Sequence, residues 1–189
     1  MNLQSFITLL IINILLHSTR AEVCPTIRKR SEWEAAKGKT HELASIPVDY
    51  AIIGHTVTRN CFCFATCASL IKNIQDDHLY QRKWNDIAYN FLIGGNGEIY
   101  EGIGFDRVGT HTRDYNSKSI GIAFIGNFND VPPEAKQLEA LDKLLKCAVF
   151  IGALKHDYKL VGQRQLVNTL SPGTQLYNEI KLMDHWFRY

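Results

Sequence analysis

Apolar runs and amphipathic stretches alternate along most of the chain. The run VDYAIIGHTVT (48–58) is apolar up to Gly-His-Thr, which is typical of a strand buried on both faces. The run SIGIAFIGNF (119–128) has the same character, and its Gly121 and Gly126 indicate close approach of another part of the chain. A third apolar strand ends at Gly162, just before a polar loop. We therefore expect three buried strands.

The segment YNFLIGGNGEIYEG (89–102) has two short apolar stretches on either side of Gly-Asn-Gly. This pattern predicts a β-hairpin. The glycines could also suggest a nucleotide-binding loop, but no G-x-G-x-x-G lies between a strand and a helix. The hairpin explains them better.

Three segments have apolar residues at helical spacing: 67–79, 132–154 and 174–187. The second begins with proline, which favours a helix N-terminus. The apolar stripes consist of Leu70, Ile71 and Ile74; Leu138, Leu141, Leu145, Ala148 and Gly152; and Leu176, Tyr177, Ile180 and Met183. Strands that alternate with helices predict an α/β sandwich around a mixed sheet.

The first 21 residues differ from the rest. An apolar core from Phe6 to Leu16 is too short to span a bilayer, and Thr19 and Ala21 occupy the −3 and −1 places of a cleavage site. We expect residues 1–21 to be a secretory signal and 22–189 to form one domain. The segment before the core departs from the usual signal pattern, because it has no Lys or Arg. A retained membrane anchor is the alternative.

Charge and hydropathy restrict the partners of the mature chain. Removal of the signal, which contains Arg20 and no acid, lowers the formal charge from +2 by one, to +1. This near-neutral charge gives no support for nucleic-acid binding. No later apolar run is long enough to span a membrane, so we expect a secreted, extracellular protein with no membrane contact of its own.

Five cysteines are present: Cys24, Cys61, Cys63, Cys67 and Cys147. In a secreted chain they are expected to form disulfides. Spacing alone does not choose among the possible pairings. A metal cluster at Cys61, Cys63 and Cys67 is a weaker hypothesis, because no fourth ligand lies nearby in sequence.

Polar and aromatic residues gather where strands and helices end. His55 ends a strand, His78 lies at a helix end, His111 lies in a loop, and the loop after Gly162 carries Gln163 and Ser171. A histidine at such a position is more often structural than functional, but three of them beside aromatics and amides indicate a groove for a sugar or peptide. No serine or cysteine protease signature and no H-E-x-x-H are present. The residues alone leave a binding protein and a hydrolase equally open.

Three longer segments carry a resemblance to a known family. They are NIQDDHLYQRKWNDIAYNFLIGGNGEIYEG (73–102), GTHTRDYNSKSIGIAFIGNF (109–128) and SPGTQLYNEIK (171–181). Together they closely resemble the peptidoglycan recognition proteins, in their short secreted insect form, from about Cys24 to the C-terminus. The resemblance implies a zinc-amidase-like fold, with a mixed central sheet, three main helices and a groove for muramyl peptide.

Catalytic members of that family bind zinc through the first His of HHT, the His of GHR and the Cys of TECPG. The matching positions here are Gly54 in IGHT, Gln163 in GQR and Ser171 in TLSPG. A catalytic zinc needs about three protein ligands and an open position. The resemblance therefore implies a site that has lost its metal, with no cofactor.

Tyr89 matches the family's catalytic-site tyrosine, and Thr169 matches an assisting position. Without a metal, neither has a bound water to activate. A substitute zinc site built from His55, His78 and His111 is chemically permitted. The family spreads these positions along its groove, so convergence on one ion is not expected.

The resemblance also implies which residues contact the ligand. The matching positions are His55, Thr56, His78, Arg82, Lys83, Trp84, Tyr89, Ile103, His111 and Asn116. Members that prefer the diaminopimelic-acid stem have Gly-Trp at Lys83-Trp84 and an Arg at Ile103, which would pair with the additional carboxylate. Trp84 is kept but Ile103 offers no donor, so the pattern favours the Lys-type stem.

The family's disulfides match Cys61–Cys67 and Cys24–Cys147, which leaves Cys63 free. We interpret the chain as a secreted innate-immunity receptor that binds peptidoglycan without cleaving it and acts through extracellular signalling proteins. Two alternatives stay open. One is an amidase that acts through substitute ligands, and the other is a decoy that binds peptidoglycan to damp signalling.

Overall fold

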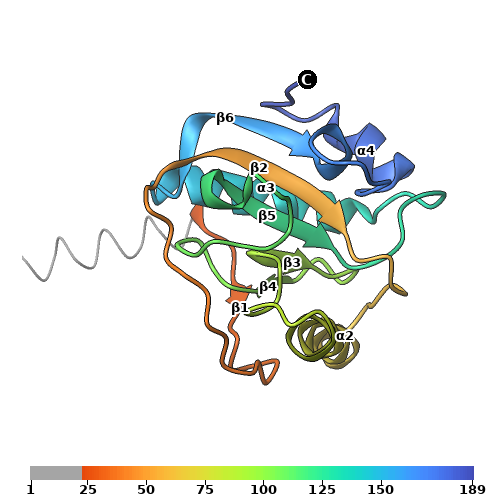
Figure 1. Ribbon diagram of the computed structural model, residues 1–189. Coiled ribbons are helices and arrows are strands. Elements are labelled where there is room, and N and C mark those ends of the chain that lie inside the picture. Colours follow the sequence, from red (N-terminus) through yellow and green to blue (C-terminus); the bar gives the residue numbers. More distant parts are fainter. Residues whose placement is uncertain (1–22) are drawn as a thin grey trace, which may run out of the picture.

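The computed structural model describes residues 23–189, so the predicted signal peptide lies outside the described residues. Six strands form one sheet in the order β1-β4-β3-β5-β2-β6 (Figure 1). Neighbours are parallel except for β3 and β4. The strands are β1 (Ile27–Arg28), β2 (Val48–His55), β3 (Phe91–Ile93), β4 (Ile99–Glu101), β5 (Ser119–Phe124) and β6 (Leu154–Gly162). The predicted mixed sheet is confirmed.

The predicted hairpin is the antiparallel pair β3–β4. Its turn is closed by the Gly94 amide, which donates to the Glu98 carbonyl at 3.0 Å. Gly97 has φ of +81°, a conformation that glycine adopts without steric cost. The glycines of this segment therefore serve the turn.

One face of the sheet is covered by α3 (Ala135–Phe150) and α4 (Thr174–Ile180). Alternate strand residues such as Ile53 and Ile122 point to this face and pack against Leu141 and Leu144. The predicted stripe of α3 is largely confirmed, because Leu141, Leu145 and Ala148 are buried. Hence the larger of the two apolar cores lies between the sheet and these two helices.

The opposite face is only half covered. Helix α2 (Phe64–Asp76) packs Leu70 and Ile71 against Leu92 of β3, Tyr100 of β4 and Ala123 of β5. Figure 1 shows α2 beside this hairpin side of the sheet. The apolar cluster that α2 forms on this face includes no residue of β2 or β6.

The helix predicted for 67–79 begins three residues earlier and changes at its end. After Asp76 the chain forms a π-helical turn, Asp77–Gln81, which contains His78. The turn is closed by the Arg82 amide, which donates to the Asp77 carbonyl at 3.0 Å, and by the Trp84 amide, which donates to the His78 carbonyl at 2.8 Å. Wider turns of this kind often occur at functional sites.

The prediction of a last helix over 174–187 was wrong in its length. Helix α4 ends at Ile180, and His185 has φ of +64°. The chain turns there because its backbone pairs with the edge of β6. The Leu160 amide donates to the His185 carbonyl at 2.8 Å, and the Phe187 amide donates to the Leu160 carbonyl at 3.0 Å. This long-range pairing overrides the helical periodicity, although Leu176 and Ile180 are buried as predicted.

The disulfides join Cys24 to Cys147 and Cys61 to Cys67. Cys63 is exposed and is the free cysteine among residues 23–189. Both pairings agree with those that the resemblance implied. In the described region, no helix has the length and apolar content that a membrane span requires.

The longer disulfide should dominate the covalent contribution to stability, because it closes 123 residues of chain. We expect the double variant Cys24→Ser/Cys147→Ser to lose about 3–5 kcal/mol of unfolding free energy. Urea denaturation is the measurement. Cys63→Ser is the matched control and should stay within about 0.5 kcal/mol of wild type. An equal loss of unfolding free energy in both variants would contradict the pairing of Cys24 with Cys147 and the free state of Cys63.

Candidate ligand-binding groove

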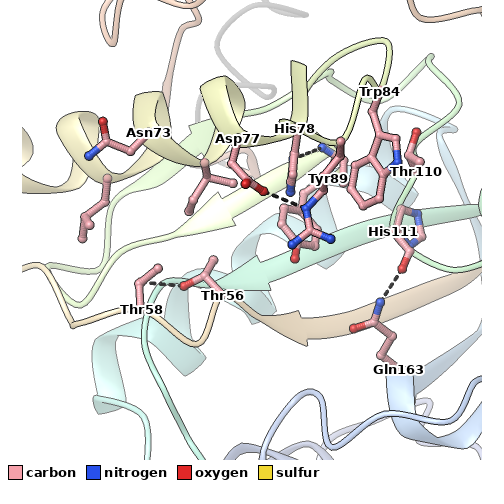
Figure 2. A pocket seen from close by; sticks show the side chains of 14 residues that line it. Thr56, Thr58, Asn73, Asp77, His78, Trp84, Tyr89, Thr110, His111 and Gln163 are labelled. Atoms are coloured by element: carbon pink, nitrogen blue, oxygen red, sulfur yellow. Dashed lines mark hydrogen bonds and ion pairs between the residues drawn. The ribbon is translucent and has the colours of Figure 1, made fainter. Parts of the chain in front are cut away.

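A groove with a volume of about 440 Å³ lies on the half-covered face of the sheet. Figure 2 shows Asn73, Asp77 and His78 along its helical side, with Thr56 and Thr58 across from them. Six residues predicted as ligand contacts line it, together with a predicted lost metal ligand. They are Thr56, His78, Arg82, Trp84, Tyr89 and His111, and Gln163.

The position of His111 depends on two glycines. A Cβ added at Gly121 of β5 would lie 2.3 Å from His111 Cδ2, and one added at Gly109 would lie 2.5 Å from the same atom. The imidazole therefore lies directly against the strand, where any side chain would collide with it. This confirms the close approach predicted at Gly121. Burial lowers the pKa of His111 to about 4, so the ring is neutral at pH 7.

His78 is held as one tautomer. Its Nδ1 accepts a hydrogen bond from the Ala88 amide at 3.0 Å, so the proton of the neutral ring is on Nε2. The His78 ring lies 4.7 Å from that of Trp84 and 6.0 Å from that of Tyr89, measured between centroids. Burial, and secondarily the charge of Arg82, lowers the pKa of His78 to about 4, and burial raises the pKa of Tyr89. These three rings form an uncharged aromatic wall with hydrogen-bonding capacity.

His55 does not line the groove. It is 5% exposed, and its Nδ1 accepts from the Phe128 amide at 3.2 Å. Burial, and secondarily the charge of Arg164, lowers its pKa to about 4. Within residues 23–189, no three His, Cys, Asp or Glu side chains lie together as a metal site. The structure thus gives no support to the three-histidine alternative.

The three positions predicted to have lost zinc ligands do come together. A Cβ built on Gly54 would lie 3.1 Å from Gln163 Oε1 and 3.2 Å from Ser171 Oγ. The Ser171 hydroxyl accepts from the His55 amide at 3.1 Å, and the Gln163 amide nitrogen donates to the His111 carbonyl. An amide, a hydroxyl and a bare backbone do not fit zinc, which binds imidazole, thiolate or carboxylate. Ser171 instead links its loop to the end of β2, and Gln163 links the end of β6 to the loop that carries His111.

Three other predicted contacts lie outside the groove. Ile103 is 5% exposed and lines a separate cavity with Arg30, Lys37 and Arg107. Lys83 occupies a left-handed turn with φ of +59°. The side-chain Oδ1 of Asn116 accepts a hydrogen bond from the Thr112 backbone amide at 2.8 Å and so supports the loop that carries His111.

Thr169, the predicted assisting residue, does not line the groove either. Its hydroxyl accepts from the Ser171 amide at 3.2 Å. In this structure it braces the loop that carries Ser171.

Residue reasoning missed several groove residues. They are Thr58, Leu70, Asn73, Ile74, Asp77, Ala88 and Thr110. Those on the helical side have a common signal, because Leu70, Ile74 and Asp77 recur at spacings of four and three. Such residues share one helix face, so the face that carries His78 could have been followed back along the helix.

Comparison with known proteins gives the family. A family model described as N-acetylmuramoyl-L-alanine amidase matches residues 44–174. The chain is 47% identical over 163 residues to "Peptidoglycan recognition protein" of Trichoplusia ni, covering 86% of this chain and 89% of the relative. It is 43% identical to "Peptidoglycan-recognition protein SA" of Drosophila melanogaster, covering 86% and 80%. The chain belongs to the peptidoglycan recognition proteins.

Solved structures of peptidoglycan recognition proteins share its fold. Drosophila peptidoglycan recognition protein SA superposes with a TM-score of 0.85 at 43% identity, covering 87% of this chain and 95% of that one. Peptidoglycan recognition protein LE, solved with tracheal cytotoxin, a monomeric diaminopimelic acid-type peptidoglycan, gives a TM-score of 0.83 at 42% identity, covering 85% and 95%. The amidase-like fold expected from the resemblance is confirmed.

Neutral buried histidines should make this peptidoglycan recognition protein sensitive to mild acid. His55, His78 and His111 have pKa values near 4 when folded, against 6.5 ordinarily. Unfolded chains therefore bind more protons between these values, and the unfolding free energy falls as pH drops from about 6.5 to 4. Each can contribute a slope of up to about 1.4 kcal/mol per pH unit.

Urea denaturation from pH 7 to pH 4 measures this slope. His78→Gln should reduce it, whereas His156→Gln, at a side chain that is 86% exposed, is the matched control and should keep it. If His78→Gln leaves the slope unchanged, the lowered pKa of His78 in the folded protein is refuted.

The converging positions also predict that a metal site can be rebuilt. We expect Gly54→His/Gln163→His/Ser171→Cys to bind about one zinc per chain, because the added side chains would meet at one point. Elemental analysis after dialysis is the measurement. The double variant Gln163→His/Ser171→Cys keeps only two ligands and should bind far more weakly. Stoichiometric zinc in the wild type would contradict this interpretation.

Proposed function

We propose that this protein is a secreted innate-immunity receptor that binds bacterial peptidoglycan in the groove without cleaving it. One observation carries the proposal. The groove is lined by aromatic and imidazole side chains, while Gly54, Gln163 and Ser171 stand at the positions where catalytic relatives would have zinc ligands. Family membership supports the ligand class, since the LE relative is described in complex with a peptidoglycan fragment.

The lining of the groove suits a muramyl peptide. The Nε2–H of His78 can donate to a carbonyl or hydroxyl oxygen of the ligand, while Trp84 and Tyr89 offer ring faces for sugar or stem atoms. Because burial keeps His78 and His111 neutral at pH 7, hydrogen bonding and packing carry recognition there. Such a surface matches a ligand made largely of amides and hydroxyls.

The absence of cleavage follows from the chemistry of the replaced positions. Amide hydrolysis in this family relies on a zinc-bound water, and Gly54, Gln163 and Ser171 do not supply zinc ligands. Burial raises the pKa of Tyr89, so the phenol stays protonated and cannot serve as a general base that activates water in place of a metal-bound hydroxide. The groove then binds peptidoglycan without hydrolysing it.

We further propose where the protein acts, which peptidoglycan stem peptide it prefers and how it affects signalling. A cleaved signal would deliver the chain to the exterior, where it meets bacterial wall fragments and acts through extracellular signalling proteins. We propose a preference for the Lys-type stem. The family resemblance supports it, because Ile103 stands where diaminopimelic-type members have an arginine, although Ile103 itself lies outside the groove. A sensor differs from a decoy in its effect on a cascade: added to cell-free insect plasma with peptidoglycan, a sensor raises the signal and a decoy lowers it.

Co-sedimentation followed by mass spectrometry tests binding and cleavage in one experiment. We expect the protein to sediment with insoluble peptidoglycan and to release no stem peptide, even with added zinc. Trp84→Ala should weaken binding by about tenfold or more, as for an aromatic at the centre of an interface. Phe62→Ala is the matched control, because Phe62 is 58% exposed and does not line the groove. Release of stem peptides by the wild type would instead establish an amidase.

A further inference from the structure

Formal charge is sparse in the groove. Among the described residues that line it, two carry a formal charge at pH 7: Asp77 and Arg82. The histidines that line it, His78 and His111, are neutral there. Any discrimination by charge inside the groove must therefore act through this acid and this base.

The two groups form an ion pair at the groove wall. Arg82 Nε donates to Asp77 Oδ2 at 2.7 Å, the dashed line at Asp77 in Figure 2. The Arg82 guanidinium carbon lies 5.1 Å from the centre of the Trp84 ring. The π-helical turn brings them together, since the Arg82 amide also donates to the Asp77 carbonyl. Both side chains are about half exposed, at 46% for Asp77 and 55% for Arg82, so a ligand can reach them.

Both charges act on the interior of the groove. The pKa of His78, lowered mainly by burial, is lowered further by the charge of Arg82 and raised by that of Asp77. By contrast, neither Lys83 nor Ile103 lines the groove. Among the described residues that line the groove, the formal charges available to a bound stem peptide are therefore those of the Asp77–Arg82 pair.

We propose that Asp77 is a specificity-determining residue, whose carboxylate neutralises and tethers Arg82 so that the groove favours a stem with an ammonium side chain over one with an additional carboxylate. This inference rests on the proposed function. A free guanidinium would pair with the ligand carboxylate through two N–H groups. Because Nε is bound to Asp77, a ligand carboxylate that approaches Arg82 is repelled by this anion and loses the Nε side of the guanidinium as a donor.

The decisive variant is Asp77→Asn, which removes the anion and leaves Arg82 in place. For a muramyl tripeptide with diaminopimelic acid at the third position, we expect affinity to rise about two- to fivefold, the upper part of the range for exposed charge pairs. For the otherwise identical tripeptide with lysine, we expect affinity to stay level or fall. Titration calorimetry at low salt measures both, and the shift in preference should shrink at about 0.5 M salt because screening weakens exposed pairs.

Asp76→Asn is the matched control. Asp76 is the preceding residue, changes the net charge equally, and pairs with Lys72 outside the groove. It should leave the ratio of the two affinities unchanged. The double variant Asp77→Asn/Arg82→Gln should lose the gain for the diaminopimelic ligand, because the guanidinium is then absent. Thermal melts confirm that each variant is folded.

The outcomes separate this inference from the proposed function. If the wild type binds neither tripeptide nor the polymer, both fall together. If it binds both tripeptides and Asp77→Asn changes the two affinities by one factor, or Asp76→Asn shifts their ratio equally, the role of Asp77 is refuted and the receptor function stands. A wild type that prefers the diaminopimelic tripeptide also overturns the role of Asp77.

Discussion

The parallel pairing of β2 with β5 and β6 is the constraint on which the site depends. Ile53 is aligned with Gly162 and with Ile122, so the three strands end at the same edge of the sheet. Parallel strands direct the loops that follow their carboxyl ends to one place. That register brings Gly54 opposite the loop of Gln163 and Ser171, although more than one hundred residues separate them in sequence. A shift of one residue in β2 would turn Gly54 to the opposite face.

At this edge of the sheet, burial sets the protonation state of the imidazole side chains. Each of His55, His78 and His111 is kept neutral mainly by its removal from water. For His78, the backbone fixes the tautomer as well. The two lining histidines therefore act as oriented, neutral polar groups, and the formal charge of the groove wall is left to Asp77 and Arg82.

The fold could be predicted from the sequence where a pattern was local and regular. The hairpin of 89–102 and the stripe of α3 follow from turn chemistry and periodicity, which depend on neighbouring residues alone. The end of α4 could not be predicted in this way, because the residues after it pair with distant Leu160. The two-residue strand β1 is too short to produce a pattern.

The candidate site was harder to predict, because it depends on where segments meet. Six groove contacts came from resemblance to a family, and the structure places them together. Resemblance also included Ile103 and Lys83, which lie elsewhere, since it transfers positions without their side-chain directions. The sequence did not predict Asp77 as a groove residue. The resemblance named no contact there, and only the structure shows that its carboxylate faces the groove.

The turn of the chain after α4 has a consequence for behaviour in a crowded fluid. Strand β6 ends one side of the sheet, and an open strand edge invites another chain to add to it. The backbone amide and carbonyl of Leu160 on that edge are hydrogen-bonded to the backbone of His185 and Phe187. Trp186 is thereby paired with Leu160 in an isolated parallel β-bridge. At the opposite side, β1 has only two residues to offer. The chain after α4 thus closes part of the β6 edge to the addition of another strand, and the short β1 limits such addition at the other edge.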